Sequence, residues 1–334
     1  MSLRWWTAGG NAQLSCHLRG TWLAAQIERT RVQDSPSAAH CQLPECEHGR
    51  PIIDTAILVF VSVRIKRAPR KTRSDELRDP LFNQSVEKAL TILEVFGGER
   101  RALNLGEIAL AVGMTKSSAQ RCTHTLERLG YLRRDARVKR WVLTPRSLSI
   151  GHAYLSGHPL IEPATTHLID LNQATGESVS LWEPDDADMV VIARFPSRKR
   201  FFIHMPIGRR LPMHCTASGR AYLSALPLAE AQKILRRSTL KQFTPMTLTD
   251  PEQIMERLQQ AREAGFAWSD QEYFRGDVTI AAVVLGDEGR PVGAVNVSAP
   301  TSRWTLEALR EKFSSVLLET VCAASGGIAA RLRA

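Results

Sequence analysis

Three short amphipathic helical patterns followed by a basic hairpin occupy residues 81–143, and this order constrains the fold more than any other feature of the chain. The first pattern starts near Ser85 and ends at Gly97, and the second starts at Asn104, a good N-cap residue. A turn of only two residues separates the second pattern from the third, which opens at Thr115. This arrangement predicts a winged helix-turn-helix domain.

Apolar residues recur at helical spacing on one face of each pattern, so each helix has an expected buried face. The residues predicted to point inward are Val86, Ala89, Leu90, Leu93 and Phe96 in the first helix, Leu105, Ile108, Ala109 and Val112 in the second, and Ala119, Cys122, Leu126 and Leu129 in the third.

The outer face of the third helix carries side chains suited to a major groove of DNA. Lysine and arginine reach phosphates or guanine edges, glutamine can pair in two ways with adenine, and serine bonds to either. The residues of this helix predicted to contact DNA are Thr115, Lys116, Ser117, Ser118, Gln120, Arg121 and His124.

A basic run at residues 133–140 lies between two short strand patterns, 131–132 and 141–143, and predicts the wing. An isolated basic hairpin is more often a solvated surface, but one that follows a helix-turn-helix favours DNA. The wing cations predicted to reach phosphates or the minor groove are Arg133, Arg134, Arg137, Lys139 and Arg140.

The net positive charge of the chain comes entirely from its first 150 residues. Residues 80–150 contain 12 Lys+Arg and 6 Asp+Glu, whereas residues 151–334 contain 20 of each. Charge restricted in this way is expected of a DNA-binding module joined to a neutral domain, and a general membrane or acidic-substrate binder would not require it.

Several ordered motifs resemble the IclR family of transcriptional regulators. In the first domain they are LNLGEIA from Leu103, GMTKSSAQR from Gly113 and LERLGYLRR from Leu126. In the second domain they are GRRLPMHCTASGRA from Gly208, AGFAWSDQEY from Ala264 and VGAVNVSAP from Val292. The resemblance spans about residues 81–330 and implies an N-terminal winged helix-turn-helix, a linker helix and a C-terminal GAF-like α+β effector domain with an antiparallel sheet.

The second domain has helical patterns alternating with short β-type runs, which predicts an antiparallel sheet with helices packed on it. The expected strands are 179–183, 189–195, 201–205, 279–285 and 291–298, and the expected helices are 160–174, 216–226, 228–237, 251–264 and one from about 305.

Four segments of the chain follow from these patterns. They are a 1–79 extension, a winged helix-turn-helix domain over 80–144, a linker helix over 145–158, and an effector-binding domain over 159–334. The extension yields no fold from its pattern, and either disorder or a start codon placed too far upstream is expected. His40, Cys41, Cys46 and His48 match no familiar zinc spacing, so no metal site is expected.

Small residues at Thr216-Ala217-Ser218-Gly219 open a helix and leave backbone N–H groups accessible. Such a helix start suits a carboxylate, although ordinary close packing explains small residues equally well. The family resemblance implies that the effector contacts Ala217, Ser218, Ser269 or Asp270, Asp277, Thr279, Asn296 and Ser298.

The chain departs from the family pattern where Thr279 replaces a common cysteine or serine and Asn296 a common serine. These departures favour an effector other than glyoxylate or pyruvate. The run from Leu211 to Arg220 resembles the branch that regulates catabolism of aromatic acids such as protocatechuate or 4-hydroxybenzoate.

The predicted function is a cytoplasmic transcriptional regulator, expected to be a repressor. It binds double-stranded operator DNA as a dimer or tetramer and responds to a small carboxylate, with no cofactor and no membrane partner. An adaptor that binds nucleic acid without an effector is the alternative. An enzyme built on the second domain is less favoured because no catalytic motif surrounds His214-Cys215 or any other residue.

Overall fold

The computed structural model describes residues 79–97, 102–135, 137–199 and 203–332, together with the backbone of three strands near the N-terminus. These strands, β1 (Arg4–Ala8), β2 (Asn11–Leu18) and β3 (Thr21–Ile27), form an antiparallel sheet in the order β1-β2-β3. The sequence pattern had not revealed them. Residues 1–64 form a unit separate from residues 65–334, and the histidines and cysteines of 40–48 lie outside the described residues.

The predicted winged helix-turn-helix is confirmed. It contains α2 (Gln84–Glu94), α3 (Leu105–Val112) and α4 (Lys116–Arg128), followed by the paired strands β4 (Leu132–Asp135) and β5 (Arg140–Leu143).

Local sequence explains how α3 begins and ends. The Asn104 side chain accepts a hydrogen bond from the Glu107 backbone N–H at 2.9 Å, and the Glu107 carboxylate accepts one from the Asn104 N–H at 2.8 Å. This reciprocal capping satisfies two N–H groups that the helix itself leaves without partners. Gly113 ends the helix with φ of 73°, a left-handed conformation that glycine adopts without strain.

The core of this domain differs from the predicted inward face of the first helix. Ile92 is fully buried and Phe96 is nearly so, whereas Val86 and Leu90 are about half exposed. Ala89 and Leu93 also pack against this core, as predicted, so within α2 the prediction of an inward position was wrong for Val86 and Leu90 only. The prediction for Leu129 was also wrong, because this residue caps α4 and is 51% exposed.

The chain continues from the wing through a short 3-10 turn, η1 (Pro145–Ser147), into α5 (Leu148–Ser156). This agrees with the helix expected between the two domains. None of the residues of α5 is buried.

The C-terminal domain is built on a six-stranded antiparallel sheet in the order β8-β7-β6-β11-β10-β9. Its strands are β6 (Ser178–Asp185), β7 (Asp188–Phe195), β8 (Arg210–Pro212), β9 (Ala267–Asp270), β10 (Asp277–Leu285) and β11 (Pro291–Pro300). The expected strand over 201–205 was wrong for its described part, because residues 203–205 are irregular. The edge strands β8 and β9 were not predicted.

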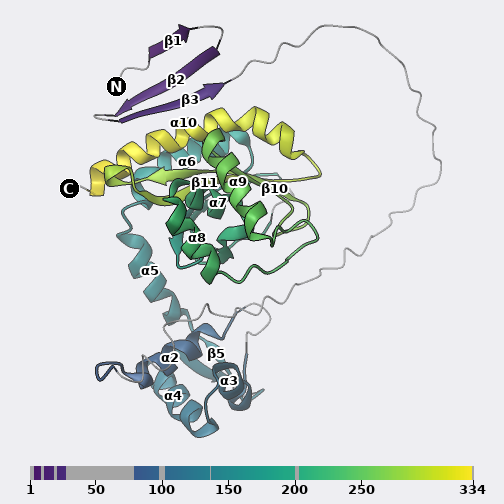
Figure 1. Ribbon diagram of the computed structural model, residues 1–334. Helices are drawn as coiled ribbons and strands as arrows, with labels where there is room; N and C mark the ends of the chain where they lie inside the picture. Colours follow the sequence, from purple (N-terminus) through teal and green to yellow (C-terminus); the bar gives the residue numbers. More distant parts are fainter. Residues whose placement is uncertain are drawn as a thin grey trace, which may run out of the picture. The chain divides into compact units, whose positions relative to one another are not determined.

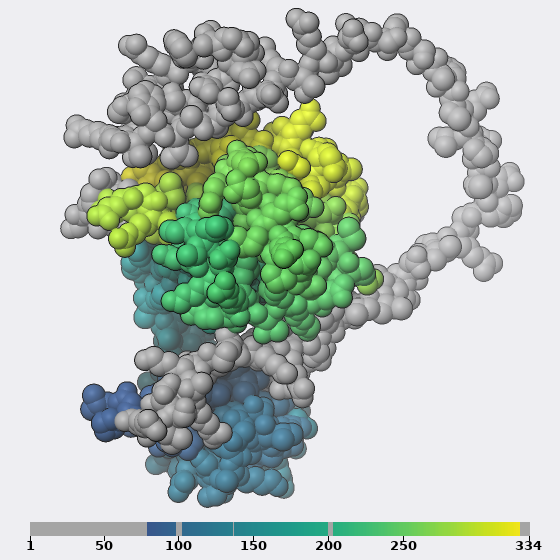
Figure 2. Space-filling model, viewed as in Figure 1, coloured from purple at the N-terminus to yellow at the C-terminus, as the bar shows by residue number. Residues whose placement is uncertain are grey.

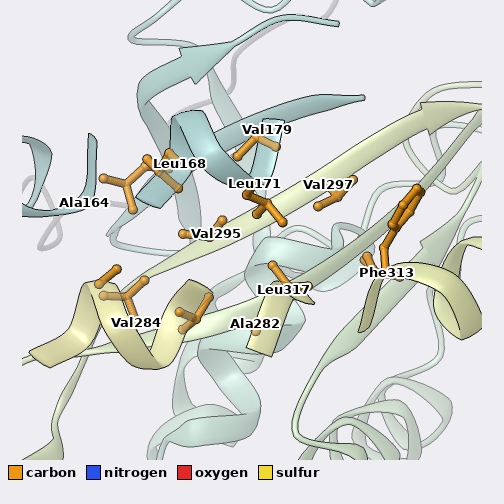
Figure 3. Packing of buried hydrophobic residues seen from close by; sticks show 14 of the residues in the cluster. Ala164, Leu168, Leu171, Val179, Ala282, Val284, Val295, Val297, Phe313 and Leu317 are labelled. Atoms are coloured by element: carbon orange, nitrogen blue, oxygen red, sulfur yellow. The ribbon is translucent and has the colours of Figure 1, made fainter. Parts of the chain in front are cut away.

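One face of this sheet, the dry face, packs apolar side chains against the helices that cover it. The helices α6 (Ile161–Thr175) and α10 (Leu306–Leu332) run across it (Figure 1). Figure 3 shows Leu168 and Leu171 of α6 and Leu317 of α10 directed toward Val295 and Val297 of β11. The predicted α+β architecture is confirmed by this layer.

The opposite face is covered by α7 (Ala217–Ala225), α8 (Leu228–Arg237) and α9 (Pro251–Ala264). Green residues from this part of the chain form the outer surface of the layer in Figure 2. The 3-10 turns η2 (Met213–Cys215) and η3 (Asp287–Gly289) precede α7 and β11. Within the described part of the chain, no helix is both long and apolar enough to cross a membrane.

Candidate functional site

The outer face of α4 is available to a partner. Lys116, Gln120 and Arg121 are exposed, as are Thr115, Ser117 and His124, while Ser118 is half-buried. The Thr115 hydroxyl caps the helix by accepting a hydrogen bond from the Ser118 N–H at 3.2 Å. The predicted DNA-contacting residues of this helix therefore share one accessible surface.

The wing presents exposed Arg133, Arg134, Arg137 and Lys139. Its turn forms without glycine, because Lys139 takes the left-handed backbone conformation with φ of 51°. The Asp135 carboxylate also accepts a hydrogen bond from the Arg137 N–H at 2.9 Å. The left-handed Lys139 and the Asp135 contact together shape this turn.

Arg140 has an internal partner that the sequence analysis did not foresee. Its guanidinium donates to both carboxylate oxygens of Glu107, at 2.9 and 3.1 Å, and to the Ala102 carbonyl at 3.1 Å. The guanidinium therefore joins the base of the wing to the capped start of α3. Its predicted contact with DNA stays untested.

A pocket in the C-terminal domain lies between the sheet and the start of α7. Strand register places polar side chains on this face of the sheet in two rows, because paired residues on neighbouring strands point to the same side of a sheet. The first row is Arg194, Ser180 and Asn296, and the second is Ser178, Ser298, Thr279 and Ser269. All of them except Ser178 and Ser180 line the pocket.

The start of α7 forms the opposite wall. Thr216 caps this helix by accepting a hydrogen bond from the Gly219 N–H at 3.3 Å. A Cβ atom on Gly219 would lie 2.2 Å from the Met213 Cα, so only glycine lets the helix start lie against η2. Ala217 and Ser218 line the pocket from this helix end, where the dipole and the backbone N–H groups favour an anion.

The pocket combines polar rows with an apolar and aromatic wall. Its lining residues are Trp182, Arg194, Ile203, Met205, Leu211, Cys215, Thr216, Ala217, Ser218, Ser269, Glu272, Tyr273, Phe274, Asp277, Thr279, Asn296 and Ser298. Such a mixture is typical of small-molecule sites.

Three charged residues line the pocket: Asp277, Arg194 and Glu272, of which Glu272 is paired with Arg220. Burial raises the pKa of Asp277 to about 6, against the lowering effect of hydrogen bonds from Ser298 at 2.7 Å and Thr279 at 2.9 Å and of the Arg194 charge. The Arg194 guanidinium donates to the Ser180 hydroxyl at 3.0 Å and to the Ile203 carbonyl at 2.9 Å, and burial lowers its pKa. Arg194 is the only cation among the described residues that line the pocket.

Two buried polar atoms in the pocket lining have no hydrogen-bond partner. They are the Trp182 indole Nε1 and the Asn296 amide Oδ1, and the two residues are only 2% and 6% exposed. Buried polar groups are nearly always satisfied by protein, water or ligand. These two atoms therefore indicate a place that a bound molecule completes.

A buried ion pair between Arg220 and Glu272 holds the start of α7 in place. Arg220 of α7 donates to both carboxylate oxygens of Glu272, at 2.5 and 2.6 Å, and to the His214 carbonyl at 3.0 Å. Glu272 also accepts a hydrogen bond from the Leu248 N–H at 3.2 Å. The pair joins α7 to the loop that carries Tyr273 and Phe274.

Comparison with known proteins identifies both domains. Residues 152–325 match the family model of the bacterial transcriptional regulator IclR C-terminal domain, and residues 85–136 match that of the IclR helix-turn-helix domain. The Pca regulon regulatory protein of Pseudomonas putida is 32% identical over 255 residues, which cover 76% of this chain and 87% of that protein. The chain belongs to the IclR family of transcriptional regulators.

Two further relatives agree with this assignment. The p-hydroxybenzoate hydroxylase transcriptional activator of Acinetobacter baylyi is 31% identical, over 74% of this chain and 92% of that protein. The crystal structure of an IclR family transcriptional regulator from Brucella abortus superposes with a TM-score of 0.65 at 26% identity and covers 76% of this chain and 96% of that chain.

The structure brings together most of the effector contacts implied by the IclR family pattern. Seven of the eight residues line the pocket, namely Ala217, Ser218, Ser269, Asp277, Thr279, Asn296 and Ser298. Of the two alternatives Ser269 and Asp270, Ser269 pairs with Thr279 and shares its face of the sheet. Asp270 does not line the pocket.

Sequence reasoning missed Trp182, Arg194 and Glu272. Arg194 gives no local signal, because a single cation on an apolar strand also fits an edge position. The alternation of Ser178, Ser180 and Trp182 on β6 is the one pattern that could have been noticed. It marks a strand whose side chains are polar or amphipathic on the sheet face that carries the pocket, and Trp182 is the one of the three that lines it.

The His214-Cys215 pair does not resemble a nucleophilic site, in keeping with the regulatory IclR family. Burial raises the pKa of the Cys215 thiol and lowers the pKa of His214 to about 4. The His214 Nε2 atom contacts the Lys241 carbonyl at 3.2 Å rather than the thiol. A neutral thiol without an adjacent base is unreactive.

The end of α5 is attached to the hairpin of β6 and β7. The Glu183 carboxylate bonds to the Tyr154 hydroxyl and lies 3.0 Å from the His158 Nε2 atom. His158 is buried and accepts a hydrogen bond from the Leu160 N–H through Nδ1 at 3.3 Å. Glu183 follows Trp182 directly, so the linker helix is joined to the strand that lines the pocket.

Proposed function

We propose that this IclR-family chain binds operator DNA through α4 and the wing, and that a small aromatic carboxylate in the pocket changes this affinity. The supporting observation is the pocket itself, in which the start of α7 and Arg194 offer two anion-binding groups beside an aromatic wall. Trp182, Tyr273 and Phe274 suit a ring, and the helix start suits its carboxylate.

The proposed role is repression by two or more copies on a symmetric operator. A twofold arrangement of recognition helices matches two half-sites on one face of DNA. The names of two relatives, a Pca regulon regulator and a p-hydroxybenzoate hydroxylase activator, favour aromatic-acid metabolism as the regulated process.

Binding of the purified chain to its own upstream intergenic DNA tests the proposal. Affinity is measured at two salt concentrations, with and without benzoate, hydroxybenzoates and aliphatic acids such as pyruvate. Specific binding that changes with an aromatic acid supports the proposal. Specific binding that is indifferent to every acid favours a DNA-binding protein without an effector.

Matched variants separate base reading from phosphate contact. Gln120→Ala or Arg121→Ala is expected to relax the preference for particular base pairs, with a loss of about 1–3 kcal/mol on the operator. Arg134→Ala is expected to weaken binding to all sequences and to reduce the salt slope by about one. Arg290→Ala, an exposed arginine of the C-terminal domain, is the control and should change neither.

The pocket is tested by Arg194→Gln. This variant removes the pocket cation, and the Kd for an aromatic acid should rise about tenfold or more while DNA binding without acid is retained. Arg210→Gln serves as the control, because Arg210 pairs with Asp185 and Asp188 outside the pocket. An unchanged Kd in Arg194→Gln would contradict the proposed anion site. A transcription assay in which the acid relieves inhibition supports repression, and activation by the protein would overturn that role.

A further inference from the structure

The two unpartnered atoms of the pocket have complementary hydrogen-bonding roles. The Trp182 Nε1–H group can only donate, and the Asn296 Oδ1 atom can only accept. Both side chains are more than nine-tenths buried and both line the same pocket. A single group that satisfies both must therefore accept and donate a hydrogen bond.

Strand register brings these two residues to one place on the sheet. Trp182 lies opposite Ala294, and Asn296 stands two residues further along the same strand as Ala294. Residues with this diagonal relationship are close enough for long side chains to meet a common group. Trp182 is aromatic and long, so its Nε1 atom can approach the space above Asn296.

Neighbouring side chains on this face cannot complete the pair. Ala281 and Ala294 are fully buried and have no polar side-chain atom. Ser180, the other cross-strand neighbour of Asn296, accepts a hydrogen bond from the Arg194 guanidinium and makes none to the Asn296 Oδ1 atom. The protein has built a donor and an acceptor here without a partner of its own.

We propose that Trp182 and Asn296 form a specificity pair for a hydroxyl substituent of the effector. A hydroxyl accepts from the indole N–H and donates to the amide oxygen, whereas a carboxylate only accepts and an ammonium group only donates. This inference rests on the proposed function and adds the substituent that distinguishes the effector from other aromatic acids.

The experiment compares four acids by isothermal titration calorimetry: benzoate and its 2-, 3- and 4-hydroxy derivatives. In the wild-type chain, one hydroxybenzoate is expected to bind about tenfold more tightly than benzoate or better, because benzoate leaves both buried atoms unpaired. The isomer that gains this affinity reports the position of the pair relative to the carboxylate.

Trp182→Phe keeps an aromatic ring and removes the N–H donor. It is expected to raise the Kd of the favoured isomer about tenfold and to leave the Kd of benzoate within about threefold of wild type. Asn296→Ser provides a second variant, with a hydroxyl on a shorter side chain, and should lower the preference in the same direction. Trp268→Phe, the same substitution at a tryptophan that does not line the pocket, should leave both Kd values unchanged.

The outcomes separate this inference from the proposed function. Equal binding of all four acids to the wild-type chain overturns the hydroxyl pair and leaves the aromatic carboxylate in place. A preference that survives in Trp182→Phe and Asn296→Ser also overturns it, because a water molecule then satisfies the two atoms. If none of the acids binds, the aromatic carboxylate itself is wrong and the pair has no such ligand.

Discussion

The two faces of the C-terminal sheet are formed by the same strands but differ in polarity: one is packed under α6 and α10, and the other carries the pocket. On β11, Val295 and Val297 pack into the dry layer under α6 and α10, while Asn296 and Ser298 face the pocket. Alternation along the strand assigns neighbouring residues to opposite environments. One face is thus apolar core, whereas the other combines a second apolar core under α7, α8 and α9 with the polar groups of the pocket.

The largest effect is expected on the dry face. Leu168→Ala removes a fully buried side chain of α6 and should lower the free energy of unfolding by about 2–5 kcal/mol. Chemical denaturation measures this change, and Leu110→Ala, at a leucine that is 85% exposed, is the control. A change in the ratio of benzoate to hydroxybenzoate affinity in Leu168→Ala would contradict the separation of the two faces.

On the pocket face, Asp277→Asn should change the pH dependence of stability. The pKa of Asp277 is raised from 3.8 to about 6, so the folded chain binds more protons than the unfolded chain between these values. The stabilising contribution of the protonated carboxyl is complete below about pH 4 and is lost as the pH rises through about 6. Ionised Asp277 then costs on the order of 3 kcal/mol at neutral pH.

The free energy of unfolding measured from about pH 4 to 7.5 checks this sign. Wild-type stability should fall with rising pH relative to Asp277→Asn, and the exposed Asp170→Asn should follow the wild-type curve. Parallel curves for wild type and Asp277→Asn would show that burial does not control this carboxyl.

A smaller effect is expected from Ser298→Ala, which removes a hydrogen bond of 2.7 Å to the Asp277 carboxylate. Stability at neutral pH should fall by about 1 kcal/mol, because the ionised carboxylate loses a donor. The loss should be smaller near pH 4, where Asp277 is protonated. An equal loss at both pH values would place the effect in packing rather than in this bond.

The smallest effect is expected where an ion pair faces water. Arg140 and Glu107 have side chains that are 39% and 40% exposed, so Arg140→Gln should cost less than about 1 kcal/mol of stability. Comparison with Arg134→Ala in a DNA-binding assay shows whether Arg140 also reaches a phosphate. A loss of affinity equal to that of Arg134→Ala would show that Arg140 also contacts DNA.

Much of the fold followed from local patterns, because caps, glycines and apolar spacing act within a few residues. Asn104 marked a helix start that the structure retains, and the helix expected over 251–264 is α9. The prediction failed where a face was decided by distant partners, as for Val86 and Leu90 on α2. It also failed at β8 and β9, since short edge strands are defined by their neighbours rather than by their own composition.

The sequence alone determined the two domains, their order and family, and the polar positions of β10 and β11, because these depend on periodicity and motif. Only the tertiary structure joined Trp182 and Arg194 to those positions, placed Ser269 but not Asp270 in the pocket lining, and paired Arg140 with Glu107. Strand register and helix packing bring together residues separated by tens of positions in the chain. No local pattern reports that Trp182 and Asn296 are buried in the same pocket, where their donor and acceptor atoms have no partner in the protein.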